Sequence, residues 1–187
     1  MKRFKRNEKG FTLVELLVAI PIMGLLGLAT GAVLVQLLHS DRISHQMVAV
    51  REVQAAGDRV SQDGVQAQYV TFGDDMTDED WSLNLVWTGE WMDESGDYVL
   101  RYENVTYTLV PADGLHELQR HEIRQLTVDG DVTETEVTAT VAKNLDVDQM
   151  WCQWEGSGDT MFSFKVVSVV GTKTEERTYN ISPRPGG

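Results

Sequence analysis

The longest apolar stretch of the chain lies close to its N-terminus. Residues 16–35 contain no charged residue, and a helix of that length spans about 30 Å, which is the thickness of a bilayer core. Basic residues precede the stretch, and Asp41 and Arg42 follow it. The pattern predicts a helix that crosses a membrane, with a cytoplasmic N-terminus and the remainder of the chain outside the cytoplasm.

An amphipathic segment follows the apolar stretch. Its hydrophobic or small residues recur at spacings of three and four, which is the period of one helix face. They are Ile43, Met47, Val50, Val53, Gly57 and Val60. We expect one helix to run from Phe11 to about Ala67 and to pack this face on a sheet.

From Trp81 onward the pattern changes to the period of two that is typical of half-buried strands. Turn sequences rich in Gly, Asp and Pro separate short hydrophobic runs. The predicted strands are 82–91, 98–101, 105–110, 116–120, 123–128, 132–139, 147–155, 161–170 and 174–181. The predicted fold class is therefore α+β, with a long N-terminal helix packed on a C-terminal antiparallel β-sheet domain.

Four residues inside the apolar stretch weaken its helix or permit close packing. Pro21 removes an intrahelical hydrogen bond, and Gly24, Gly27 and Gly31 lower the helix propensity. Gly27 and Gly31 form a G-x-x-x-G pair, which allows two membrane helices to approach closely. Glycine is also common in membrane helices without such a role, so we predict a kink or a packing function here and leave the choice open.

Charge is distributed unevenly along the chain. The chain has 29 acidic and 16 basic residues. The first ten residues hold only one of the acidic residues but five of the basic ones. The rest of the chain is therefore strongly acidic. Binding to nucleic-acid phosphates needs clustered Lys and Arg, so we predict no direct nucleic-acid binding.

Glu15 stands at the edge of the apolar stretch, where a carboxylate without a partner is costly. If the chain were cut between Gly10 and Phe11, a new α-amino group would lie one helical turn from Glu15. The two groups could pair within one chain or between staggered neighbouring subunits, and the second arrangement would set the register between helices.

The sequence from Gly10 to Ile20, GFTLVELLVAI, resembles the N-terminal cleavage and methylation motif of type IV prepilins and type II secretion pseudopilins. The resemblance implies that a prepilin peptidase cuts after Gly10 and methylates the amine of Phe11. It also implies that Glu15 pairs with the amine of a neighbouring subunit in a filament. The family commonly has a proline where Ala32 stands here, so Pro21 departs from its pattern.

The resemblance also implies a division of the chain and a set of partners. The expected parts are a leader at 1–10, a transmembrane and assembly helix at 11–38, an amphipathic helix at 39–70 and a β-rich domain at 71–187. The implied partners are prepilin peptidase, other pilin or pseudopilin subunits, an inner-membrane assembly platform and membrane lipid. No cofactor is implied.

The expected function is that of a structural subunit. The C-terminal half, with Arg120, residues 141–145 and residues 182–184, resembles the larger minor pilins and pseudopilins, which serve adhesion, DNA uptake or protein secretion. One alternative is a membrane-tethered surface protein that does not polymerise and binds a ligand through its β-rich domain. A second alternative is a secreted protein with an ordinary signal peptide, but the apolar stretch is long and no A-x-A site follows it.

One acidic segment raises the question of metal binding. Its carboxylates could serve calcium, which prefers several oxygen ligands, but the spacing of an EF-hand is absent. A solvated loop is the favoured interpretation. The residues concerned are Asp74, Asp75, Asp78, Glu79 and Asp80.

The sequence gives no support for an enzyme. His116 and His121 are five residues apart, whereas a helical zinc motif needs a spacing of four. The single Cys152 excludes an intramolecular disulfide and has no basic neighbour to activate it. The five tryptophans are expected in the core, with a carbohydrate-binding surface as the alternative.

Overall fold

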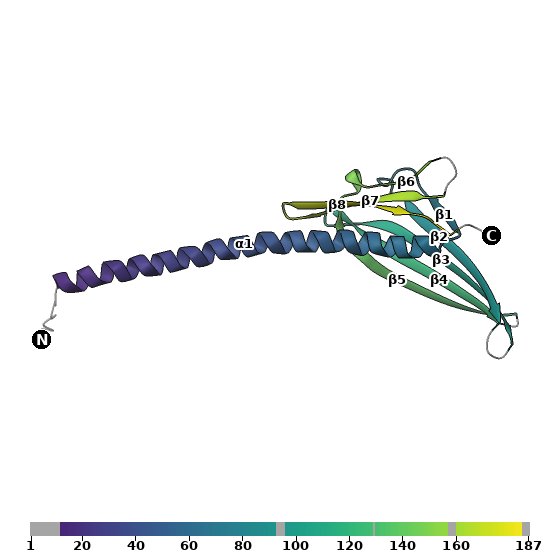
Figure 1. Ribbon diagram of the computed structural model, residues 1–187, viewed down its shortest axis with the longest axis horizontal. Helices are drawn as coiled ribbons and strands as arrows, with labels where there is room; N and C mark the ends of the chain where they lie inside the picture. Colours follow the sequence, from purple (N-terminus) through teal and green to yellow (C-terminus); the bar gives the residue numbers. More distant parts are fainter. Residues whose placement is uncertain (1–11, 93–95, 129, 157–159, 185–187) are drawn as a thin grey trace, which may run out of the picture. The chain divides into compact units, whose positions relative to one another are not determined.

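The computed structural model describes residues 12–92, 96–128, 130–156 and 160–184. The chain divides into two compact units, residues 1–43 and residues 44–187. The elements in chain order are α1 (Leu13–Gln66), β1 (Tyr69–Phe72), β2 (Ser82–Met92), β3 (Tyr98–Ala112), β4 (Leu115–Val128), β5 (Asp131–Leu145), the 3-10 helix η1 (Val147–Gln149), β6 (Trp151–Trp154), β7 (Phe162–Val170) and β8 (Lys173–Ile181) (Figure 1). This is the predicted α+β class: a long N-terminal helix packs on an antiparallel sheet.

The first unit holds the N-terminal half of α1. The helix is continuous through Pro21, and its large apolar side chains are exposed, Leu13 by 83% and Leu28 by 74%. By length and composition, α1 is a helix that can cross a membrane. A β-carbon added at Gly24, Gly27 or Gly31 would have no atom within 4 Å, so the chain itself leaves this surface uncovered.

The second unit is built on one antiparallel sheet. Strands β1 to β5 follow one another as neighbours, while β7 lies between β6 and β8. Among the described residues, the strand pairing between the two groups is that of Leu145 in β5 with Ser168 in β7, and the Asp146 N–H beside it donates to the Val167 carbonyl at 3.0 Å. The turn between β3 and β4 holds Asp113 and Gly114, with φ of 50° and 80°, and two positive φ values suit a type I′ hairpin turn.

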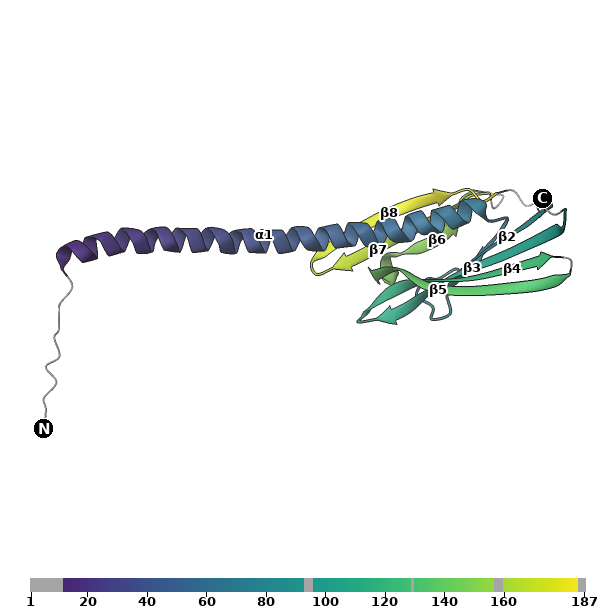
Figure 2. The same cartoon turned by 90° about the horizontal axis from the view of Figure 1, so that it is seen from below.

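The C-terminal part of α1 lies along the sheet (Figure 2). Its buried positions are Ala49, Val53, Ala56 and Val60, and small residues let the helix approach closely. A β-carbon on Gly57 would lie 2.0 Å from Cζ of Tyr179. The core beneath the helix contains Leu83, Leu85, Val105, Tyr107, Leu118, Phe162, Phe164, Val166 and Ile181.

The predicted helix face was partly wrong. Val53, Gly57 and Val60 do face the sheet, but Ile43 and Met47 are 48% and 67% exposed. The spacing pattern counted the large hydrophobic residues and passed over Ala49 and Ala56, which occupy the contact instead.

The predicted strand boundaries also needed correction. Predicted strands 98–101 and 105–110 are one strand, β3, and predicted strands 116–120 and 123–128 are one strand, β4. Strand β1 was not predicted, and η1 replaces the start of the predicted strand 147–155.

Candidate processing and assembly site

The start of α1 forms a reciprocal hydrogen-bonded cap. The backbone N–H and the hydroxyl of Thr12 each donate to Oε2 of Glu15 at 2.9 Å. In return, the backbone N–H of Glu15 donates to the Thr12 hydroxyl at 3.3 Å. This is a capping box, in which an N-cap Thr and an acid three residues later satisfy each other's free donors.

The capping box gives Glu15 a partner within its own chain. Its carboxylate is held beside the first turn of α1, where the partial positive charge of a helix N-terminus favours an anion. The role of Thr12 was not predicted. The T-x-x-E spacing of Thr12 and Glu15 at the start of an apolar run is nevertheless the known signature of a capping box.

The structure brings only part of the expected processing site into view. Gly10 and Phe11, the residues on either side of the expected cut, lie outside the described residues. Glu15 lies in the first turn of α1, and Pro21, Gly24, Gly27 and Gly31 lie further along the same helix.

Residues 5–31 match the prokaryotic N-terminal methylation motif. The N-terminal segment therefore carries the methylation motif found in type IV prepilins and pseudopilins. A comparison with curated proteins and a comparison with solved structures each gave no match. The match ends at residue 31, within α1, and the second unit lies outside it.

The motif, the apolar helix and the fold carry three consequences for the chain. The methylation motif implies processing by a prepilin peptidase. The motif together with the apolar helix indicates a precursor in the inner membrane. The long helix on an antiparallel sheet is the pilin-like arrangement, and it indicates a structural subunit rather than an enzyme.

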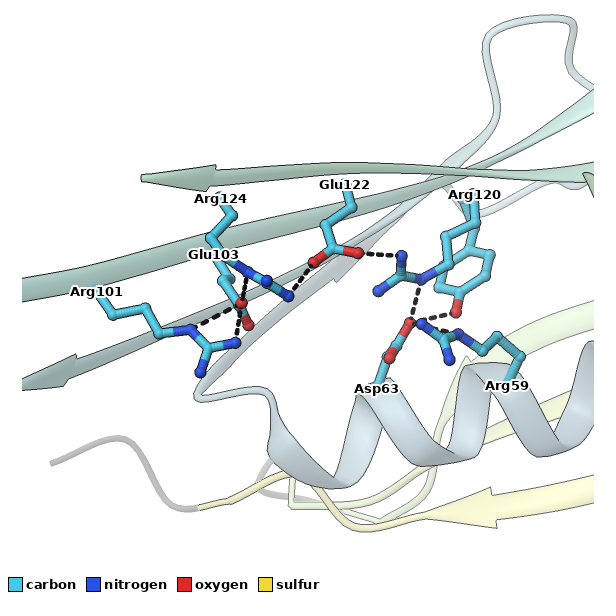
Figure 3. A network of polar contacts seen from close by, with 8 residues as sticks. Arg59, Asp63, Arg101, Glu103, Arg120, Glu122 and Arg124 are labelled. Carbon is cyan, nitrogen blue, oxygen red and sulfur yellow. Dashed lines mark hydrogen bonds and ion pairs between the residues drawn. The ribbon is translucent and has the colours of Figure 1, made fainter. Parts of the chain in front are cut away.

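A network of charged side chains joins the second half of α1 to the sheet (Figure 3). It begins at Asp63, which is 4% exposed. Its Oδ2 atom accepts hydrogen bonds from the Tyr107 hydroxyl and from Nε of Arg120, both at 2.6 Å. Arg59, one turn earlier on α1, adds a weaker contact at 3.6 Å.

The network continues along β3 and β4. Nη1 of Arg120 donates to Glu122 at 2.5 Å, and Nη2 of Arg124 donates to the other oxygen of Glu122 at 2.7 Å. Arg124 also donates to Glu103, which is 1% exposed. Arg101 completes the row, with its Nε atom 2.8 Å from Oε1 of Glu103.

The pKa values of the network reflect these contacts. Burial and the charge of Asp63 raise the pKa of Tyr107, so its hydroxyl stays protonated and donates. Burial alone would lower the pKa of Arg120, but its hydrogen bonds to Asp63 and Glu122 raise it overall. Burial opposes ionisation of Glu122, yet the two arginines outweigh it and the pKa is lowered.

This network was not predicted, although the sequence carries a signal for it. Arg120, Glu122 and Arg124 alternate in sign at a spacing of two, as do Arg101 and Glu103. Residues two apart on a strand share a face, so each run forms a row of alternating charge. Charged residues in water need no particular order along a strand. Charged residues removed from water each need a neighbour of opposite sign.

The other candidate residues have structural roles in the second unit. Asp75 accepts hydrogen bonds from the Thr77 N–H at 2.9 Å and hydroxyl at 2.7 Å, which lowers its pKa. Among the described residues, no group of His, Cys, Asp or Glu is arranged to hold a metal. Calcium binding was the less favoured interpretation of this loop, and the contacts of Asp75 give it no support.

Cys152 and two of the tryptophans lie in or against the core. Cys152 is 6% exposed, and burial raises its pKa to about 12, so it is a neutral thiol. Trp81 is buried and donates to the Gly73 carbonyl at 3.0 Å, and Trp154 stacks on Phe72 with centroids 5.4 Å apart. These two tryptophans serve the core, as expected.

Proposed function

We propose that this chain is a minor pilin or pseudopilin that enters a type IV pilus-like or type II secretion filament. Prepilin peptidase removes residues 1–10 and methylates the amine of Phe11. The resulting subunit keeps residues 11–38 in the membrane as an assembly helix, while residues 39–70 carry the helix into the β-rich part at 71–187. The observation that supports this most is the methylation motif at residues 5–31, which runs into the start of a helix whose apolar side chains are exposed.

The exposed apolar surface supports a role in assembly. Leu16, Leu17 and Ile20 are 55%, 66% and 63% exposed in the isolated chain. Lipid covers such a surface in the precursor, and neighbouring helices cover it in a filament. Close packing there depends on small residues, which Gly24, Gly27 and Gly31 provide.

The capping box suggests how Glu15 changes partner. In the precursor, the carboxylate accepts two hydrogen bonds from Thr12. Cleavage creates a positive amine on Phe11, and the amine of a staggered neighbour offers Glu15 a partner of opposite charge. The Thr12 donors are uncharged, whereas the amine brings a full positive charge to the carboxylate, so proteolysis supplies the group that directs polymerisation.

The acidic second unit fits an extracytoplasmic location. Its strong net negative charge keeps it soluble, and the positive leader stays on the cytoplasmic side. We therefore propose a single-pass precursor in the inner membrane with a cytoplasmic N-terminus. The assembly platform of that membrane and related subunits are its proposed partners.

Glu15→Gln tests the proposal. It keeps the side-chain shape but removes the charge, so we expect normal processing and loss of the subunit from sheared filaments. Thr12→Ala is the matched control, because it removes the capping hydroxyl and leaves the carboxylate. We expect Thr12→Ala subunits in filaments. Glu15→Gln subunits present in filaments at the wild-type level would contradict the role proposed for Glu15. Absence of the wild-type chain itself from sheared filaments would favour a tethered protein that does not polymerise.

A further inference from the structure

Strand β5 has one edge with almost no partner. On one side it pairs with β4 from Asp131 to Leu145. On the other side, within the part of the chain that the structure describes, β5 pairs with another strand only through Leu145 and Ser168 of β7. Alternate residues of a strand direct their N–H and C=O groups away from each neighbour in turn, so residues 131–140 present a row of backbone groups that no described strand pairs with.

The local backbone explains why β5 leaves β7. Asn144 has a φ of 56°, a left-handed conformation that interrupts an extended strand. The register with β4 also shifts on both sides of Leu118, which marks a bulge that bends a strand. At this point the Lys143 N–H donates to Glu52 of α1 at 2.7 Å instead of to a strand. The bend at Asn144 and the bulge opposite Leu118 therefore keep the edge of β5 away from β7.

The edge is also uncovered on both faces. All ten residues from Asp131 to Thr140 are exposed. Natural proteins blunt long free edges with proline, with charged side chains, especially lysine, or with a covering element. The segment DVTETEVTAT has no proline or lysine, its only charged residues are three acids, and it is rich in threonine and valine, which favour strands. Such an edge is suited to accept an added strand.

The side chains along the edge define the chemistry of the added strand. Glu134 and Glu136 lie two residues apart and so share one face of the sheet, and the Glu136 side chain is 63% exposed. Val132 is on the same face and is 63% exposed. A lysine beside this row would place its ammonium at a carboxylate and its apolar stem over the valine.

A second copy of this chain is a poor occupant. An antiparallel pair of β5 edges centred on Thr135 would place Glu134 opposite Glu136. A pair centred on either glutamate would place that residue opposite itself, and like charges directly opposite are destabilising. The strong negative charge of the second unit adds repulsion between copies.

We infer that the free edge of β5 binds an extended segment of another protein, which adds one strand to the sheet and carries lysine or arginine at alternate positions opposite Glu134 and Glu136. The inference concerns an interaction surface and holds whether or not the chain polymerises. Its failure would leave the proposed processing and assembly unaffected.

The test uses the full chain, processed and held in detergent micelles, with a short synthetic peptide in which lysine alternates with threonine. Binding is followed by titration and by hydrogen exchange. We expect slower exchange of the amides in 131–140. Two further peptides carry backbone N-methyl groups on all lysines or on all threonines. Because only one set of amides faces β5, one methylated peptide should lose binding and the other should keep it. If the peptide paired with β5 one residue out of register, its lysines would lie on the face of the sheet opposite to Glu134 and Glu136.

Two double variants locate the charge effect. Glu134→Lys with Glu136→Lys should weaken lysine-peptide binding at least about tenfold, since it replaces two attractions with repulsions. The matched control, Asp78→Lys with Glu79→Lys in the acidic loop, changes the net charge by the same amount and should bind as wild type. Equal loss in both double variants would overturn the inference.

Four other outcomes would also overturn it. One is no binding of the lysine peptide, and another is binding that neither methylation pattern affects, which would show attraction without strand pairing. The third is protection at 173–181 of β8 in place of 131–140. The fourth is a concentration-dependent dimer of the chain itself, in which the same β5 amides are protected without peptide.

Discussion

The Nε atom of Arg120 in β4 lies 2.6 Å from Oδ2 of Asp63 in α1, and both side chains are less than a tenth exposed. This ion pair links the helix to the middle of the sheet. It is supported by the Tyr107 hydroxyl on one side and by Glu122 on the other. Because every partner in this group is hydrogen-bonded, removal of one charge leaves another buried without compensation.

Asp63→Asn should therefore destabilise the second unit strongly. The substitution keeps the size of the side chain but removes one of the two carboxylates that pair with the Arg120 guanidinium, and it removes the one that links α1 to the sheet. Removal of one partner from a buried ion pair costs about 3–5 kcal/mol. We expect a loss of that order in the free energy of unfolding, measured by urea denaturation of the processed chain in detergent.

Asp58→Asn is the matched control for Asp63→Asn. Asp58 is an exposed acid on the same helix, five residues earlier, and an exposed substitution typically changes stability by less than about 0.5 kcal/mol. Similar effects of the two substitutions would show that the network adds no stability of its own.

Glu122 should contribute to the loss of stability in acid. Its pKa is lower in the folded chain than its usual value, so the unfolded state binds more protons as the pH falls. The stabilisation from Glu122 is present above its usual pKa and is lost as the pH falls through the folded value. Glu122→Gln should be less stable than wild type near neutral pH, and the difference should shrink toward about pH 3.

Urea midpoints of both proteins at several pH values measure this difference. Glu79→Gln, in the exposed acidic loop, serves as the control and should follow the wild-type curve. A constant difference between Glu122→Gln and wild type at every pH would show that the effect of Glu122 is packing rather than charge.

Gly57 should be intolerant of even a methyl group. Alanine there would place its β-carbon 2.0 Å from Cζ of Tyr179, so the ring or the helix must move. Overpacking of this kind costs about 1–3 kcal/mol, which outweighs the gain of up to about 1 kcal/mol in helix propensity. We expect Gly57→Ala to lower the free energy of unfolding measured in urea.

The same substitution should change sign when the ring is absent. In a Tyr179→Ala background the steric conflict disappears, so Gly57→Ala should be neutral or stabilising there. If Gly57→Ala had the same effect in both backgrounds, the close approach of α1 to β8 would not be the reason for this glycine.

The sequence predicted the helix well because its two signals are local. The uncharged run and the spacing of Val53, Gly57 and Val60 both depend only on neighbouring residues. The predicted helix from Phe11 to about Ala67 compares with the observed Leu13–Gln66. Ala49 and Ala56 were missed because an alanine says little by itself about which face is buried.

The strands were harder to predict because their continuity depends on distant partners. The gap predicted between 101 and 105 contains Glu103, and the gap between 120 and 123 contains Glu122. A carboxylate inside a strand indicates a turn or an exposed edge when the sequence is considered alone. In the fold, Arg124 contacts both carboxylates, so the strands continue through them. The charge alternation at a spacing of two was the only local sign of this arrangement.

If proteolysis creates the amine with which Glu15 pairs, the exported protein must begin at Phe11. The most direct measurement is therefore the identity of its N-terminal residue. Mass spectrometry of protein purified from membranes and from sheared filaments should show a chain that begins at Phe11 and carries one added methyl group. A chain that retains residues 1–10 in the filament, or that begins at any other residue, would contradict the account.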